Sequence, residues 1–221
     1  MASRRTARRR ALGEILLPSL SAGVVGAGIA LLAQACALLP PRAPDDLCAI
    51  FAQHRSWHAA ARSSYQRWGV PEPVILAVLH QESRFRAKAK PGWRRSLGLI
   101  PVGRLSTAYG YGQVKEGTWT DYVRSTGRPG AERDQFSDVV DFVGWYGDVI
   151  HRLTAVAKDD AFHLYLAYHE GPAGFRGRSF DDKPWLLGVA RKVQARASLY
   201  TSQYGGCRDP ADGTGLWSFA P

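Results

Sequence analysis

One carboxylate in this sequence stands where acid catalysis would be favoured. Glu82 follows an apolar run at residues 74–79, and the residues one turn before it on the same helix face are apolar. Desolvation and the negative end of the helix dipole both raise the pKa of such a carboxyl group, as a general acid near neutral pH requires. The alternative is a helix-end glutamate that faces solvent or pairs with Arg84 or Arg86.

Other catalytic patterns in the sequence are incomplete. His80 and Glu82 match the His-x-Glu half of a zinc deaminase signature, but no Pro-Cys-x-x-Cys follows. His169-Glu170 lacks the second histidine of a His-Glu-x-x-His zinc helix. The serine nucleophile pattern Gly-x-Ser-x-Gly and a phosphate-binding loop are absent as well. The sequence therefore predicts no catalytic metal and no cofactor.

Three segments, in order along the chain, resemble the motifs of the soluble-lytic-transglycosylase-type (SLT) domain. Residues 70–85 resemble its catalytic helix, which ends in Glu-Ser, here Glu82-Ser83. Residues 108–113 are similar to its Gly-Leu-Met-Gln motif, with Tyr111 and Gly112 in place of Leu and Met.

The third segment, residues 167–171, resembles the Ala-Tyr-Asn-x-Gly motif, with His169 in place of Asn. The resemblance covers roughly residues 65–200. It implies that Glu82 is the catalytic acid and base and that the Tyr168 hydroxyl orients its carboxyl group. It also implies a set of substrate-binding residues: Ser106, Gly110, Tyr111, Gln113, Tyr168 and His169.

The resemblance implies a lytic transglycosylase that acts on peptidoglycan. Glu82 would protonate the oxygen between N-acetylmuramic acid and N-acetylglucosamine, and the muramic 6-hydroxyl would close a 1,6-anhydro ring without water. The alternatives are a lysozyme-type hydrolase and a catalytically weak wall-binding scaffold. A hydrolase needs a second carboxylate. The nearest candidate is Glu170, two residues after Tyr168 and so about 200° around the helix.

The elements that must position these residues are predicted to be helices. A capping aspartate, Asp45 or Asp46, would start the first, and Gly69 would end it. Residues 84–107 read as a long loop. The fold class is expected to be mainly α: a lysozyme-like single domain with a substrate cleft, preceded by an N-terminal export or anchor segment. The helical patterns cover about 46–68, 71–82, 115–126, 136–150, 160–168 and 183–204.

The N-terminal segment is predicted to export the chain. Residues 4–10 are rich in arginine, and residues 15–41 then carry no charge over 27 positions, against about 20 for a membrane-spanning helix. Ala33-Gln34-Ala35 before Cys36 resembles a lipobox, with Cys36 as the lipidated residue; an uncleaved anchor and a released protein are the alternatives. The expected location is the periplasm, with attachment to the membrane.

Export makes the two remaining cysteines informative. An oxidising compartment favours a disulfide between Cys48 and Cys207, while two unrelated small apolar side chains are the alternative. The predicted organisation is a signal or anchor segment at 1–36, a linker at 37–46, the catalytic domain at 47–207 and a flexible tail at 208–221.

The net charge of +10 comes partly from the arginines of the N-terminal segment, and the rest of the chain carries only +6. A mildly basic domain suits an anionic partner such as the cell wall or a lipid surface. The basic residues after the leader are scattered and form no nucleic-acid motif, so a nucleic-acid partner is not expected. The expected partners are peptidoglycan strands and a membrane.

Overall fold

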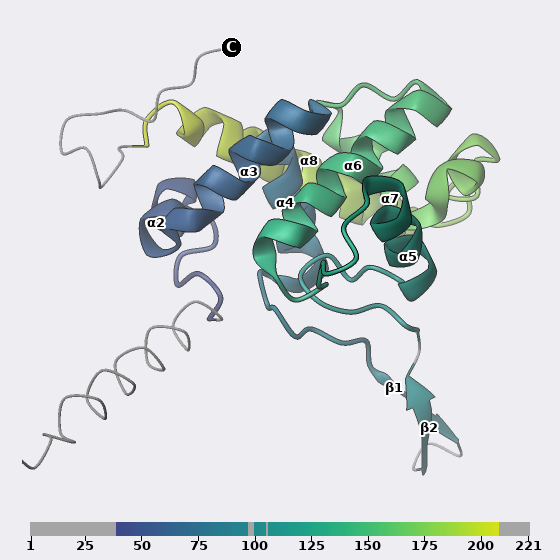
Figure 1. Cartoon of the computed structure of the whole chain (residues 1–221). Coiled ribbons are helices and arrows are strands. Elements are labelled where there is room, and N and C mark those ends of the chain that lie inside the picture. The colour runs from purple at the N-terminus through teal and green to yellow at the C-terminus, as the bar shows by residue number, and fades with distance from the viewer. Residues whose placement is uncertain (1–38, 97–99, 105, 208–221) are drawn as a thin grey trace, which may run out of the picture. The chain divides into compact units, whose positions relative to one another are not determined.

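A computed structural model of the chain describes residues 39–96, 100–104 and 106–207 (Figure 1). The predicted signal segment, its Cys36 and the predicted tail at 208–221 lie outside these residues. Along the described residues, no helix combines the length and apolar character needed to cross a membrane. The described helices are α2 (Leu47–Gln53), α3 (Arg55–Trp68), α4 (Glu72–Ser83), α5 (Glu116–Thr126), α6 (Phe136–Thr154), α7 (Ala161–Arg176) and α8 (Pro184–Tyr204).

Helix α4 is the centre of the domain. Pro73 lies in its first turn, where proline costs no hydrogen bond, and every residue from Pro73 to Leu79 is buried. A helix that is apolar all round has to be covered on every side. Helices α3, α6 and α8 provide that cover, and α7 packs between α6 and α8 (Figure 1). The prediction of a mainly α, single-domain fold is confirmed.

The first expected helix is divided in two. The Asp46 side chain caps α2 by accepting a hydrogen bond from the Ala49 amide, at 2.9 Å. The backbone of His54 then leaves the helical region, with φ −126° and ψ 72°. Its amide closes α2 on the Ile50 carbonyl, while its own carbonyl accepts the first bond of α3 from Trp57. The break turns the chain, so α2 and α3 can both pack on the core.

The expected loop at 84–107 contains regular structure. Strands β1 (Trp93–Ser96) and β2 (Ile100–Arg104) pair antiparallel as a hairpin between α4 and α5 (Figure 1). Trp93 pairs with Arg104 and Ser96 with Ile100, with an irregularity between Arg94 and Arg95. The prediction of an irregular loop is therefore wrong at these positions. Backbone pairing satisfies hydrogen bonds whatever the side chains, so the basic composition did not indicate it.

Helix α7 carries a break that positions the third motif. Gly171 adopts φ 78° and ψ 158°, which is not helical, and helical turns then resume as far as Arg176. A residue with a side chain is strained at this backbone conformation, whereas glycine is not. The helix expected over 160–168 thus continues through a kink at Gly171 to Arg176.

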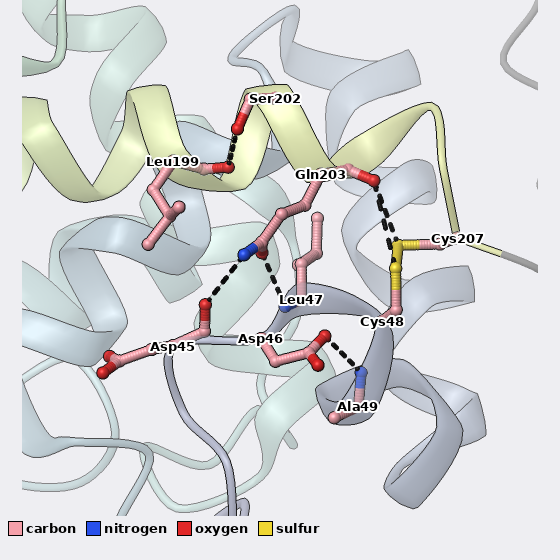
Figure 2. The surroundings of a disulfide bond; sticks show 9 residues. All are labelled: Asp45, Asp46, Leu47, Cys48, Ala49, Leu199, Ser202, Gln203 and Cys207. Atoms are coloured by element: carbon pink, nitrogen blue, oxygen red, sulfur yellow. Dashed lines mark hydrogen bonds between the residues drawn. A yellow bond between two sulfur atoms is a disulfide. The ribbon is translucent and has the colours of Figure 1, made fainter.

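Figure 2 shows the Cys48–Cys207 disulfide, which joins α2 to the segment after α8. Gln203 of α8 adds to this link. Its side-chain oxygen accepts a bond from the Leu47 amide at 2.9 Å, and its side-chain nitrogen donates to the Asp45 carbonyl at 3.1 Å (Figure 2). The start of α2 is therefore held to the end of the last helix by covalent and polar contacts.

Candidate active site

Glu82 lies in the last turn of α4, where the buried helix reaches a partly exposed position. Burial raises the pKa of its carboxyl group to about 7, although a hydrogen bond from Tyr165 acts in the opposite direction. About half of such groups carry a proton near neutral pH, so the carboxyl can donate a proton and take one back. A pKa in this range suits a single group that serves as acid and then as base.

The hydroxyl that contacts Glu82 belongs to Tyr165 and not to Tyr168. Tyr165 is buried on α7 and donates a hydrogen bond to the Glu82 carboxyl. The Tyr168 hydroxyl donates instead to the carbonyl of Gly112, at 2.8 Å. The expectation that Tyr168 orients the carboxyl is therefore corrected. Tyr165 stands one turn earlier on the same face of α7, and this spacing was the signal in the sequence that could have found it.

Tyr168 nevertheless connects all three motifs. Its hydroxyl lies close enough to Glu82 for the charge of that carboxylate to raise the Tyr168 pKa, after desolvation as the main cause. Through its bond to Gly112 it also contacts the second motif. A Cβ at Gly112 would lie 3.0 Å from the Tyr168 oxygen and 3.1 Å from Val139. Glycine in place of the usual methionine thus lets the two motifs approach closely.

Gly110 and Gln113 shape the loop of the second motif. Gly110 has φ 81°, and a Cβ there would lie 1.8 Å from the Arg133 carbonyl oxygen, so only glycine fits. The Gln113 side-chain nitrogen donates to the carbonyls of Ala89 and Gly110, at 3.0 and 2.9 Å. These bonds tie the second motif to the turn after α4. In this structure the Gln113 amide nitrogen holds the loop in place.

The Tyr111 side chain is part of the hydrophobic core. It is 1% exposed, and its ring packs edge-on against Trp57 and Phe136, with centroids 5.8 and 5.5 Å away. The structure assigns this ring to the core, and substrate binding by Tyr111 stays a prediction. The motif resemblance aligned it with an apolar residue, and burial in the core satisfies that same pattern.

Ser106 and His169 also lie apart from the carboxyl group. The Ser106 hydroxyl accepts a bond from the Ala108 amide at 3.1 Å, and no contact among the described residues joins it to Glu82. His169 is exposed, with its ring edge-on to Trp185 and its Nδ1 3.0 Å from a carboxylate oxygen of Glu170. A substrate contact by either residue stays a prediction.

Glu170 is held in an ion pair. The Lys183 ammonium lies 2.9 and 2.7 Å from its two oxygens, and the Ser179 hydroxyl donates to it as well. Desolvation acts in the opposite direction, but hydrogen bonds from Lys183, Ser179 and His169 lower the pKa of Glu170 to about 2. This carboxylate is therefore ionised and occupied by partners within the chain.

A second carboxyl group with a raised pKa lies at the other end of α4. Glu72 is 3% exposed, and desolvation raises its pKa to about 7 against a hydrogen bond from Tyr204 and the charge of Arg62. It borders a cavity of about 890 Å³ formed with residues of α3 and α8, which does not include Glu82. A large cavity with a perturbed carboxyl group is an ordinary candidate site. The second and third motifs do not border this cavity, and the Glu-Ser signature of the first motif lies at Glu82, so Glu82 is the stronger candidate.

Among the described residues, no group of three or more His, Cys, Asp or Glu side chains is arranged to hold a metal ion. At Glu82 the structure offers a carboxyl group with a raised pKa, a hydrogen bond from Tyr165 and the Tyr168 hydroxyl nearby.

Residues 24–207 match the family model described as the transglycosylase SLT domain. No curated protein matches the chain.

Proposed function

The chain belongs to the transglycosylase SLT domain family, and we propose that it is a peptidoglycan lytic transglycosylase with Glu82 as its only catalytic carboxyl group. The family implies a lysozyme-like domain and a peptidoglycan substrate. The observation that carries the assignment of Glu82 is its partly buried carboxyl, which has a pKa of about 7 and a hydrogen bond from Tyr165.

The proposed reaction needs one group that exchanges a proton twice. Protonated Glu82 donates to the oxygen that links N-acetylmuramic acid to N-acetylglucosamine, and the bond from the muramic C1 to that oxygen breaks through an oxocarbenium-like state. The muramic 6-hydroxyl then attacks C1, and its proton passes to the Glu82 carboxylate. The products are a 1,6-anhydro end and a free 4-hydroxyl, and Glu82 is protonated again.

The state of Glu170 favours this reaction over hydrolysis. A lysozyme-type hydrolase uses a second carboxylate as base or nucleophile. Glu170 is the nearest such group in the sequence motifs, and Lys183 and Ser179 engage both of its oxygens. An internal hydroxyl needs no activation of water, because it is already held beside the reacting carbon. We therefore propose that the muramic hydroxyl is the nucleophile.

The test is to digest purified sacculi with the chain and to weigh the muropeptides. Anhydro ends are one water lighter than reducing ends, and the proposal requires them to dominate. Glu82→Gln is the control, and it should release far less of either product than the wild type. A digest that consists mainly of reducing ends would instead support the hydrolase, and folded, wild-type protein without any product would support the wall-binding scaffold.

We further propose that the chain is exported and held at the membrane by its N-terminal segment, with lipid on Cys36. The support is the sequence pattern: arginines, then 27 uncharged residues that contain a lipobox-like segment. Mass spectrometry of the N-terminal peptide from the native host tests this proposal. An acylated Cys36 is expected, whereas an intact leader or an unmodified mature end would contradict lipidation.

A further inference from the structure

The described chain is fixed to the domain almost from its first residue. Pro41 is buried, and the Arg42 amide donates a hydrogen bond to the Gln53 side chain at 3.0 Å. The Gln53 side chain in turn donates to the Pro40 carbonyl at 3.4 Å, while Leu39 is 57% exposed. The linker expected at 37–46 therefore provides little slack. Only three residues lie between Cys36 and Pro40, so these two positions are at most about 14 Å apart.

Exposed cations surround this point. Arg86, Lys88 and Lys90 are all exposed, and they line a hollow of about 470 Å³ together with Pro40. The hollow therefore has basic walls and the start of the described chain at its edge.

A second basic hollow lies between α4 and α8. Arg84, Lys192 and Arg196 line it, along with His80, and its volume is about 490 Å³. Burial and then the positive charge of Arg196 lower the pKa of His80 to about 4, so this histidine is neutral near pH 7. The turn after α4 contributes to both hollows, with Arg84 lining the second and Arg86 the first.

The acidic groups near this surface are few and occupied. Asp45 forms an ion pair with Arg196 and lies within electrostatic range of Arg84 and His80. Asp46 caps α2. No carboxylate of the described residues forms an ion pair with Arg84, Lys88 or Lys192. The remaining contacts are weaker. The Arg86 guanidinium donates to the Ser83 carbonyl, and the Lys90 ammonium lies 5.4 Å from the centre of the Tyr109 ring.

We propose that this surface rests on the anionic headgroups of the membrane that holds the leader. We name it the exit face and define it as Arg84, Arg86, Lys88, Lys90 and Lys192 around Pro40. The inference rests on the proposed membrane attachment and is independent of the proposed chemistry. A tether of at most about 14 Å keeps the surface around Pro40 next to the bilayer. Lysines and arginines at that distance attract anionic lipid, and each strengthens the contact about fivefold.

The experiment uses the full chain in two kinds of vesicle. One contains phosphatidylglycerol mixed with phosphatidylcholine, and the other contains phosphatidylcholine alone. A water-soluble amine reagent labels exposed lysines, and mass spectrometry reports the extent at each position. We expect Lys88, Lys90 and Lys192 to be labelled several-fold less in the anionic vesicles, and expect 1 M salt to remove the difference because it screens the attraction. Lys115, exposed at the start of α5, is the internal control and should not change.

Variants test whether the charges cause the protection. Arg84 has φ 52°, so Arg84→Asn keeps a residue that tolerates this backbone, and it is combined with Arg86→Gln. Removal of two cations should weaken the contact about 25-fold and expose the three lysines. The matched control is Arg124→Gln with Arg152→Gln, which removes two exposed charges from α5 and α6. A single Lys192→Gln change on α8 supplies a second variant, read at Lys88 and Lys90, in case the turn after α4 does not tolerate the first.

Several outcomes would overturn the inference. If the chain binds both kinds of vesicle and its lysines are labelled equally in both, the contact between the exit face and anionic lipid is contradicted. The proposed membrane attachment would still stand. A chain that floats with neither vesicle would contradict the attachment, and the exit face with it. Protection that appears only when soluble peptidoglycan fragments are added to neutral vesicles would assign the surface to the wall polymer instead of lipid.

Discussion

At the scale of single residues, Glu82 and Glu72 have carboxyl groups with the same raised pKa, of about 7, at opposite ends of α4. We expect only Glu82 to act on the substrate. Glu82→Gln should lower turnover by about 10²- to 10⁴-fold, because the amide keeps the volume but has no proton to transfer. Glu72→Gln should leave turnover nearly unchanged. The measurement is the release rate of muropeptides from sacculi.

Circular dichroism and retention of the disulfide serve as controls for folding in both variants. If folded Glu72→Gln protein were inactive while Glu82→Gln kept its rate, the catalytic acid would belong to the cavity at the start of α4.

Two tyrosines one turn apart on α7 should have separable effects. Glu82 must be protonated to act as an acid, so kcat/KM should fall as the pH rises through its pKa of about 7. The Tyr165 hydrogen bond lowers that pKa, and Tyr165→Phe should therefore move the fall in activity to higher pH. Tyr168→Phe removes a bond to the Gly112 carbonyl and should lower the rate without moving the curve.

The pH dependence of kcat/KM, measured from about pH 5 to 9 on a soluble glycan, separates the two roles. Identical midpoints for wild type and Tyr165→Phe would contradict a direct hydrogen bond between Tyr165 and Glu82.

At the scale of elements, burial of α4 has an electrostatic cost that depends on pH. The carboxyl of Glu72 has an ordinary pKa of 4.5 and a pKa of about 7 in the folded chain. Its contribution to stability is thus fully present below pH 4.5 and is lost as the pH rises through 7. The loss is on the order of 3 kcal/mol. Glu72→Gln should gain stability relative to wild type between pH 5 and 8, as measured by urea unfolding.

The difference in the free energy of unfolding between wild type and Glu72→Gln isolates the effect of Glu72. The raised pKa of Glu82 contributes equally to both proteins and cancels. Glu170 acts in the opposite sense: its lowered pKa stabilises the fold above pH 4.5 and ceases to do so as the pH falls towards 2. A wild-type curve parallel to that of Glu72→Gln between pH 5 and 8 would show that Glu72 is not desolvated.

The loop of the second motif depends on one glycine. At Gly110 a Cβ would lie 1.8 Å from the Arg133 carbonyl, at a φ of 81° that disfavours side chains. Gly110→Ala should destabilise the fold by more than about 2 kcal/mol. Gly117→Ala is the matched control, because a Cβ there meets nothing within 4 Å and the residue is helical. It should stabilise the fold by about 1 kcal/mol.

Urea midpoints of the two variants give this comparison directly. Equal midpoints for Gly110→Ala and wild type would mean that the loop can rearrange away from Arg133.

At the scale of the whole molecule, the Cys48–Cys207 disulfide joins residues 159 positions apart. In the loop-entropy model, a crosslink of this length stabilises the folded state by about 5 kcal/mol, since it restricts the unfolded chain. Cys48→Ala with Cys207→Ala should lower the free energy of unfolding by roughly that amount. Urea unfolding, with and without reductant, measures it.

The unfolding free energy of the double variant should not change with reductant, because it has no disulfide to reduce. This variant therefore controls for other effects of the reductant. Unchanged stability of the wild type after complete reduction, checked by thiol counting, would mean that the polar contacts of Gln203 hold the two ends without the disulfide.

Much of the fold was predictable because its signals are local. The apolar run before Glu82 indicated a buried helix. Gly69 and Gly127 indicated helix ends, and both adopt the left-handed backbone that ends α3 and α5. Backbone pairing in the hairpin at 93–104 was missed, because neither alternation nor a two-residue turn signal marks it. The break at His54 was missed for a similar reason, since it depends on how two helices pack on one core.

The sequence by itself determined which chemistry is available: a glutamate at the end of an apolar helix, two further motifs in order, and two cysteines that can pair. Only the tertiary structure decided which side chains meet. The rotation of α7 about its axis brings Tyr165 to Glu82 and turns Tyr168 towards Gly112. Periodicity gives the face on which a residue lies, but it does not give the angle at which that face meets another helix. That angle is set by packing against α4, α6 and α8.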